Sequence, residues 1–258
     1  MISNNYIKNA GLLALCLLFA SCNYGKKTEG SEMQPTKTDK TIFSFFGAPG
    51  SGKGTLAEQC VEKLGYQTLS TGALFRQQIA QGTELGKKIE SIIKSGKLVP
   101  DNITIEVVTL WLKERANSNA PIILDGFPRT KAQTEKLIEI LKTVLPEHKL
   151  RIIALDLPEQ EIVERLSGRR VCENKQCPAT YNISMPEIAN GKCPKCGSKL
   201  IQRPDDKPEV IKERFEVYKK NEKEVLDAYR NAGFKIETLN ISKMNPTEVF
   251  DSFKKLVS

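Results

Sequence analysis

The feature that most constrains the fold is a strand, a glycine-rich loop and a helix in immediate succession. Residues Thr41–Phe46 are mainly aromatic and β-branched and predict a buried strand. The next nine residues, 47–55, contain the spacing G-x-x-x-x-G-K, and a helical pattern begins at Leu56. Glycines allow such a loop to point its N–H groups at one concave spot, where the helix adds its positive dipole end. The sequence therefore predicts a site for a chain of phosphates, with Lys53 reaching the outer ones.

A plain glycine-rich turn is the alternative interpretation of this loop, and the full motif between a strand and a helix disfavours it. The loop also departs from the general motif, because Gly54 stands where most such loops place Ser or Thr. The hydroxyl that would hold magnesium is therefore displaced or missing.

Composition places the chain among folded proteins without choosing a ligand. Its 258 residues are 40% hydrophobic and 27% charged, which suits one α/β domain with insertions. The net charge of +8 would suit polyanionic substrates, nucleic acid or a membrane surface. A solvated lysine-rich surface explains the same surplus more simply than a dedicated patch.

Strands and helices alternate along the rest of the chain. Further strands are predicted at 66–69, 121–125, 151–157 and 235–239, and helices at 56–64, 102–116, 131–145, 158–168 and 208–231. Two helical pieces are joined around Gly82 and Gly86. Five strands that alternate with helices indicate an open parallel sheet with right-handed crossovers.

Residues 1–40 are predicted to be a leader and a flexible tether. The apolar run 10–20 is too short to span a bilayer, and Ser21-Cys22 follow it as in a bacterial lipoprotein signal, which would acylate Cys22. Phe19 departs from that signal, in which an aliphatic residue is usual. The alternative is an upstream extension that is not normally translated, with Met33 as the working start.

Four cysteines crowd one short stretch. Cys172, Cys177, Cys193 and Cys196 have the ligand types of a structural zinc knuckle, with no position open for water. Such a metal would fold a segment too short to build its own core. The alternative is two disulfides, which export of the chain would favour.

Five motifs together resemble one family. They are residues 47–55, Ser70-Thr-Gly72 with Arg76, Leu98-Val-Pro-Asp101, Asp125-Gly-Phe-Pro-Arg-Thr130 with Gln133, and Gly168-Arg-Arg170. In this order and spacing they resemble the adenylate kinases from about Thr41 to the C-terminus, and the cysteine insert is similar to the long-lid form. The resemblance implies a P-loop kinase fold, with a five-stranded parallel sheet flanked by helices. It implies a core at 41–69, 100–167 and 206–258, a helical flap for the nucleoside monophosphate at 70–99, and a zinc-bearing lid at 168–205.

The resemblance implies reversible transfer from MgATP to AMP, giving two ADP, in a closing cleft. The nucleophile is an AMP phosphate oxygen that is already anionic at pH 7, so no general base is needed. The protein must supply alignment and charge neutralisation. Expected partners are ATP, AMP and ADP without nucleic acid, expected cofactors are Mg²⁺ and structural Zn²⁺, and a monomer is expected. The need for ATP favours the cytoplasm, and a lipid anchor at Cys22 is the alternative.

The same resemblance assigns the site residues. Catalytic roles are implied for Lys53, Asp125, Arg129, Arg169, Arg203 and Arg214. ATP contacts are implied for Gly50, Ser51, Gly52, Lys53, Gly54, Thr55, Arg165, Arg169, Thr180, Tyr181 and Met244. AMP contacts are implied for Thr71, Arg76, Lys97, Leu98, Val99, Gly126, Phe127, Pro128, Arg129, Gln133, Arg203 and Arg214. Guanidinium groups suit these roles because they grip phosphate oxygens in pairs.

Three assignments rest on further expectations. Asp125 would orient Mg²⁺ through bound waters, or would merely cap a helix. Adenine is expected against the backbone of 97–99, with polar contacts from Thr71 and Gln133. Arg165 and Arg169 are four residues apart and would lie near one helix face if the helix continued through Gly168.

Three other functions are weighed against this one. The nearest is a kinase for UMP, CMP or GMP on the same scaffold. A zinc-ribbon protein that binds nucleic acid would leave the phosphate loop unexplained. A lipid-anchored protein that only binds nucleotides would leave the matched arginines unexplained.

Overall fold

The computed structural model describes residues 40–174, 177, 179–188 and 190–258. The chain divides into two units, Met1–Lys37 and Thr38–Ser258, and the second contains every element described below. The predicted leader, with Cys22, lies outside the described residues. Within the described ranges, no helix combines the length and apolar character needed to cross a bilayer.

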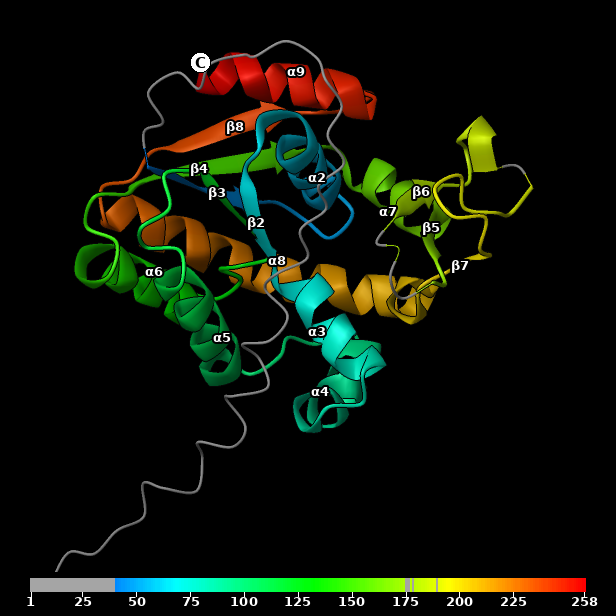
Figure 1. Ribbon diagram of the computed structural model, residues 1–258, viewed down its shortest axis with the longest axis horizontal. Coiled ribbons are helices and arrows are strands. Elements are labelled where there is room, and N and C mark those ends of the chain that lie inside the picture. Colours follow the sequence, from blue (N-terminus) through cyan, green and yellow to red (C-terminus); the bar gives the residue numbers. More distant parts are fainter. Residues whose placement is uncertain (1–39, 175–176, 178, 189) are drawn as a thin grey trace, which may run out of the picture. The chain divides into compact units, whose positions relative to one another are not determined.

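Five parallel strands form the central sheet, in the order β2-β3-β1-β4-β8 (Figure 1). Their bounds are β1 Thr41–Phe46, β2 Gln67–Ser70, β3 Ile122–Asp125, β4 Lys149–Asp156 and β8 Ile236–Asn240. The predicted five-stranded parallel sheet is confirmed, and the predicted strand ends shift by one or two residues. The central strand β1 ends at the glycine-rich loop, so the sheet presents that loop at its carboxyl edge.

Helices cover both faces of this sheet (Figure 1). The central strand β1 is buried along its whole length, as expected of a parallel strand packed on two sides. Phe43 and Phe45 pack with Phe253 in one core cluster, on the face covered by α2 (Lys53–Leu64) and α9 (Pro246–Val257). On the opposite face, Ile42 and Phe46 pack in a second core cluster. That face is covered by α5 (Asp101–Lys113), α6 (Lys131–Thr143) and α8 (Pro208–Asn231).

The helix after the loop begins earlier than its pattern predicts. α2 starts at Lys53 rather than Leu56, because its first turn carries no core residue and the apolar periodicity begins only at Leu56. Gly52, with φ 90°, caps the helix in the left-handed conformation that glycine adopts without strain. Gly65, also left-handed, ends it.

Two smaller segments extend from the sheet. Between β2 and α5, α3 (Thr71–Ala80) and α4 (Glu84–Lys94) enclose a small core of Phe75, Ile89 and Val99. After α7 (Glu159–Gly168), an antiparallel sheet has the order β6-β5-β7. Its strands are β5 Arg169–Cys172, β6 Thr180–Asn182 and β7 Leu200–Ile201, accompanied by the short helices η2 Pro186–Ile188 and η3 Pro204–Asp206.

Candidate active site

The glycine-rich loop is held in place by the lysine that its motif predicts. Lys53 Nζ donates to Gly47 O at 2.8 Å, to Ala48 O at 2.9 Å and to Ser51 Oγ at 3.1 Å. A Cβ at Gly50 would lie 2.7 Å from the Leu166 side chain, so the loop needs glycine there to approach α7. These contacts keep the loop curved around the ammonium group.

The start of α2 supplies hydrogen-bond donors to this curve. The first helical hydrogen bond runs from Leu56 N to Gly52 O at 3.0 Å, so the N–H groups of Lys53, Gly54 and Thr55 precede the helical ladder. Together with the helix dipole they form an anion-binding end. The loop therefore has the geometry that the sequence predicts for phosphate.

Lys53 carries a lowered pKa. Burial above all, together with the nearby Arg129, Arg214 and Arg169, lowers the pKa of the ammonium group to about 8 against the opposing effect of Asp125. An anionic ligand stabilises the charged form of a cation that lies in a partly dehydrated, electropositive environment. Bound phosphates would therefore raise this pKa.

This shift predicts a pH dependence. In the free enzyme, kcat/KM for MgATP is expected to fall above a pKa of about 8, as Lys53 loses its proton. Because the folded pKa of about 8 lies below the ordinary lysine pKa of 10.5, the unfolded chain binds more protons between those two pH values. The contribution of Lys53 to stability must therefore rise with pH across that window. Activity and urea titrations of the wild type and Lys53→Met would test both signs, because the variant should lack both effects.

Asp125 ends β3 beside the loop. Its Oδ2 accepts a hydrogen bond from Ser70 Oγ at 2.9 Å, so the hydrogen bond described for this carboxylate comes from a hydroxyl rather than a helix N-terminus. A Cβ at Gly54 would lie 3.4 Å from the same oxygen. The carboxylate therefore lies against the loop residue that replaces the usual Ser or Thr.

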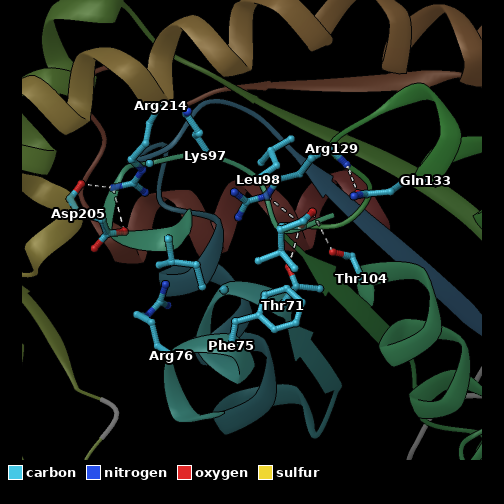
Figure 2. Close-up of a pocket in the computed structure, with 15 residues that line it drawn as sticks. Thr71, Phe75, Arg76, Lys97, Leu98, Thr104, Arg129, Gln133, Asp205 and Arg214 are labelled. Atoms are coloured by element: carbon cyan, nitrogen blue, oxygen red, sulfur yellow. Dashed lines mark hydrogen bonds and ion pairs between the residues drawn. The ribbon is translucent and has the colours of Figure 1, made fainter. Parts of the chain in front are cut away.

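A pocket opens between α3, the segment before α5 and the end of β3 (Figure 2). Nine residues predicted for AMP line it: Thr71, Arg76, Lys97, Leu98, Val99, Gly126, Arg129, Gln133 and Arg214. Phe127 and Pro128 are buried behind the pocket, joined by a cis peptide bond. Thr71 Oγ1 donates to Gly126 O at 2.9 Å. A Cβ at Gly126 would lie only 2.7 Å from Arg129 Nη2, so a larger residue at this position would clash with the guanidinium group.

Two buried aspartates hold three of the predicted arginines. Arg203 donates Nε and Nη2 to the two carboxylate oxygens of Asp205, at 3.0 and 2.9 Å. Asp206, fully buried, accepts from Arg169 Nε at 2.7 Å and from Arg214 Nη1 at 2.9 Å. Although burial opposes it, Arg203 and Arg214 hold the pKa of Asp205 well below its usual value. The aspartates therefore fix the positions of the guanidinium groups before any ligand arrives.

Arg76 lies near these arginines and aspartates but, among the described residues, has no carboxylate hydrogen-bonded to it. Its guanidinium has no hydrogen-bond partner within the described ranges of the chain. Burial, and next the charge of Arg203, lower the pKa of Arg76 to about 9. Figure 2 shows Arg76 at the opposite side of the pocket from Arg129. Such a half-buried cation, with no hydrogen-bond partner among the described residues, is poised to bind an anion.

Charge in the site is strongly unequal. Among the residues described above, seven cations (Lys53, Arg76, Lys97, Arg129, Arg169, Arg203 and Arg214) share it with three carboxylates (Asp125, Asp205 and Asp206), an excess of four. This excess of positive charge favours the binding of an anionic ligand.

The two arginines around Gly168 have different surroundings. α7 ends at Gly168, and Arg169 has extended backbone at the start of β5, so the expectation of one shared helix face is wrong. Arg165 Nη2 donates to Ile241 O and to Met244 O, each at 3.4 Å, whereas Arg169 binds Asp206. The structure thus joins Arg165 to Met244, two of the residues expected at ATP.

The cysteine cluster has the spacing of a metal site. The four Sγ atoms of Cys172, Cys177, Cys193 and Cys196 lie within 4.8 Å of one another. Cys172 and Cys196 are 3.3 Å apart, and Cys177 and Cys193 3.7 Å, against about 2.05 Å for a disulfide. Each of the four is free of disulfides. Hydrogen bonds from Ser198 lower the pKa of Cys196 to about 6, whereas burial raises the pKa of Cys172 to about 12, so Cys196 ionises more readily than Cys172.

Zinc fits this donor set. A tetrahedron with Zn–S bonds of about 2.3 Å has edges of about 3.8 Å, near the observed separations. Tyr181, expected over ATP, has its hydroxyl 3.6 Å from Cys193 Sγ, and Thr180 is exposed on β6. The cluster could therefore hold a structural metal.

From the sequence, Asp205 and Asp206 are expected only near the return hinge of the lid, and their pairing with the arginines is not predicted. Asp206 is 37 residues from Arg169, and no local pattern links them. The available signal was a pair of acids directly after Arg203-Pro204, close to so many matched arginines.

A phosphate loop whose lysine lies within electrostatic reach of the arginines of a cationic pocket defines a P-loop enzyme of phosphoryl transfer between nucleotides. The family model for adenylate kinase matches residues 45–234, and the chain belongs to the adenylate kinase family. The adenylate kinase of Archaeoglobus fulgidus is 45% identical over 190 residues, covering 73% of this chain and 86% of the relative. Those of Thermosipho africanus and Lactobacillus johnsonii are 43% and 42% identical over 197 and 216 residues. They cover 76% and 83% of this chain and 90% and 97% of the relatives.

Proposed function

We propose that aligned phosphates and fixed positive charge carry catalysis in this adenylate kinase. As a member of its family, the chain transfers a phosphoryl group reversibly from MgATP to AMP, giving two ADP. The observation that carries the proposed mechanism is the pocket of unbalanced cations beside the phosphate loop. Alignment of reacting groups can lower a barrier by roughly 7–11 kcal/mol, so no acid–base side chain is required.

On the AMP side, Arg76 and Arg129 bind the phosphate from the two sides of the pocket. Arg76 is suited to this role because its guanidinium lacks a hydrogen-bonding partner among the described residues, and Arg129 because its Nε is oriented by Gly126 O at 2.9 Å. The adenine lies against the backbone of 97–99, near Gln133. Arg203 and Arg214, held by the aspartates, face the transferring group.

On the ATP side, Lys53 and the start of α2 would bind the outer phosphates, and Asp125 would hold Mg²⁺ in place when the metal is bound with ATP. Magnesium, when bound with ATP, neutralises phosphate charge and orients the transferring group. Arg165 and Met244 lie at the base end, and Arg169 bridges toward the transferred phosphoryl group.

The cysteine cluster holds structural zinc and makes residues 168–205 a lid. Lys195 of this segment lies 3.3 Å from both Glu58 and Glu62, so the segment contacts the helix α2 that follows the phosphate loop. With residues 70–99 as the opposing flap, closure excludes water from the phosphoryl group.

Comparison of acceptors tests the function. We expect the purified full-length chain, with MgATP, to phosphorylate AMP much faster than UMP, CMP or GMP. Initial rates with each monophosphate at equal concentration would measure this. A faster rate with another monophosphate would assign the enzyme to that acceptor. A failure to phosphorylate any of them would contradict the proposed reaction.

From the ATP requirement and the family we infer a cytoplasmic enzyme, and from the family a monomer. Lipid anchoring through Cys22 is the alternative. Mass spectrometry of the mature N-terminus distinguishes these possibilities. An acylated Cys22 would support the anchor, and a start at Met33 or Met1 would exclude it.

A further inference from the structure

The carboxylate of Asp101, which is not among the predicted site residues, holds the side-chain amide of Gln133 at the pocket. Gln133 lines the pocket but is only 2% exposed, because its side chain lies between α5 and the segment before α6. Gln133 Nε2 donates to Asp101 Oδ1 at 2.7 Å, and Gln133 Oε1 accepts from Arg129 N at 2.8 Å. Both ends of the amide are therefore engaged (Figure 2 labels Gln133 beside Arg129).

The two partners have fixed and opposite polarity. A carboxylate only accepts hydrogen bonds, and a backbone N–H only donates. Asp101 must therefore face the nitrogen of the Gln133 amide, and Arg129 N must face its oxygen. Asp101 is itself fixed, because its Oδ2 accepts from Thr130 Oγ1 at 2.9 Å.

An amide locked in this way has one N–H and one oxygen lone pair left. Adenine offers a matching acceptor at N1 and a donor at its 6-amino group. A base with a 6-oxo group reverses both polarities, since it carries a hydrogen on N1 and an acceptor at O6. If the amide could turn over, it would accept either kind of base.

We propose that Asp101 is a positioning residue for acceptor specificity: it locks the Gln133 amide in the orientation that selects a 6-amino purine over a 6-oxo purine. This inference rests on the proposed function and assigns one of its specificity determinants. The same amide holds Arg129 N, so the lock also ties recognition of the base to the arginine at the phosphate.

Kinetics with AMP and IMP test the proposal, because the two nucleotides differ only at the polar positions 1 and 6 of the base. Asp101→Ala should raise KM for AMP roughly 10-fold, the cost of an unmade hydrogen bond to a buried polar group. It should lower the AMP-to-IMP ratio of kcat/KM by a similar factor and leave KM for MgATP unchanged.

The conservative variant separates positioning from folding. Asp101→Asn should keep most of the wild-type AMP-to-IMP ratio of kcat/KM, because its Oδ1 can accept from Gln133 while its Nδ2 donates to Thr130 Oγ1. Asp101→Glu keeps the negative charge at the start of α5 but displaces the carboxylate. It should therefore lower the AMP-to-IMP ratio of kcat/KM as much as Asp101→Ala does. This variant also serves if Asp101→Ala fails to fold. Asn102→Ala, an exposed neighbour on the same turn, should behave like the wild type.

An unchanged AMP-to-IMP ratio in Asp101→Ala and Asp101→Glu would overturn this inference while leaving the proposed function intact. Absence of AMP phosphorylation by the wild type would instead overturn the proposed function. The two failures are therefore distinguishable.

Discussion

Lys53→Met is expected to lower kcat by about 10³-fold, the loss measured for charges that stabilise a transferring group. Lys53 is the cation inside the loop, and its Nζ also holds two loop carbonyls, at Gly47 and Ala48. Methionine keeps the length of the side chain and removes both the charge and the donors. Steady-state assays of ADP formation would measure the effect.

Stability separates loss of catalysis from loss of fold. Because burial lowers the pKa of Lys53, the folded protein holds this charge at a cost, and its removal should not lower the melting temperature. Lys63→Met, at the last turn of the same helix, is the matched control and should retain full activity. A Lys53→Met enzyme with near-normal kcat would show that the loop lysine does not serve the transfer.

Cys193→Ser is expected to release the metal and unfold the lid, lowering kcat/KM by about 10²-fold or more. Cys193 is buried in a small cluster with Cys172, Ala179, Ile188 and Leu200, which is too small a core to hold the segment alone. Serine is a poor zinc ligand. Metal analysis of the purified proteins, and a thermal unfolding transition that moves downward, would record the loss independently of activity.

Chelation distinguishes zinc from a disulfide in the same cluster. A chelator should reproduce the loss in the wild type, and a thiol reductant without chelating power should not. Lys192→Ala, exposed beside Cys193, is the control and should keep one zinc per chain. A structural zinc site would be contradicted if the wild type kept its full stability after removal of the metal, or if the reductant alone inactivated it.

The parts of the fold that were predicted are those encoded locally. The loop between β1 and α2 has its lysine and glycines within nine residues, so one motif defines its geometry. The start of α2 was misplaced because its first turn contributes no core residue. The shared face for Arg165 and Arg169 was wrong because α7 ends at Gly168, where the chain turns into β5.

The parts that escaped prediction depend on contacts between distant segments. Asp206 meets Arg169 across 37 residues, and Asp101 meets Gln133 across 32. Neither pair can be read from periodicity or from spacing in the sequence, because each contact forms only when two distant elements pack together. The sequence could therefore name the arginines and Gln133 without their carboxylate partners.

The central claim is that fixed charge and alignment, rather than an acid–base side chain, carry phosphoryl transfer. The most direct test is the single-turnover rate of ADP formation in the enzyme saturated with MgATP and AMP, measured as a function of pH. Above the second phosphate pKa of about 6, we predict a flat profile through about pH 8, since the nucleophile is already anionic and bound phosphates keep Lys53 charged. A rate that rises tenfold per pH unit across this range would reveal a residue that must lose a proton, and would contradict the claim.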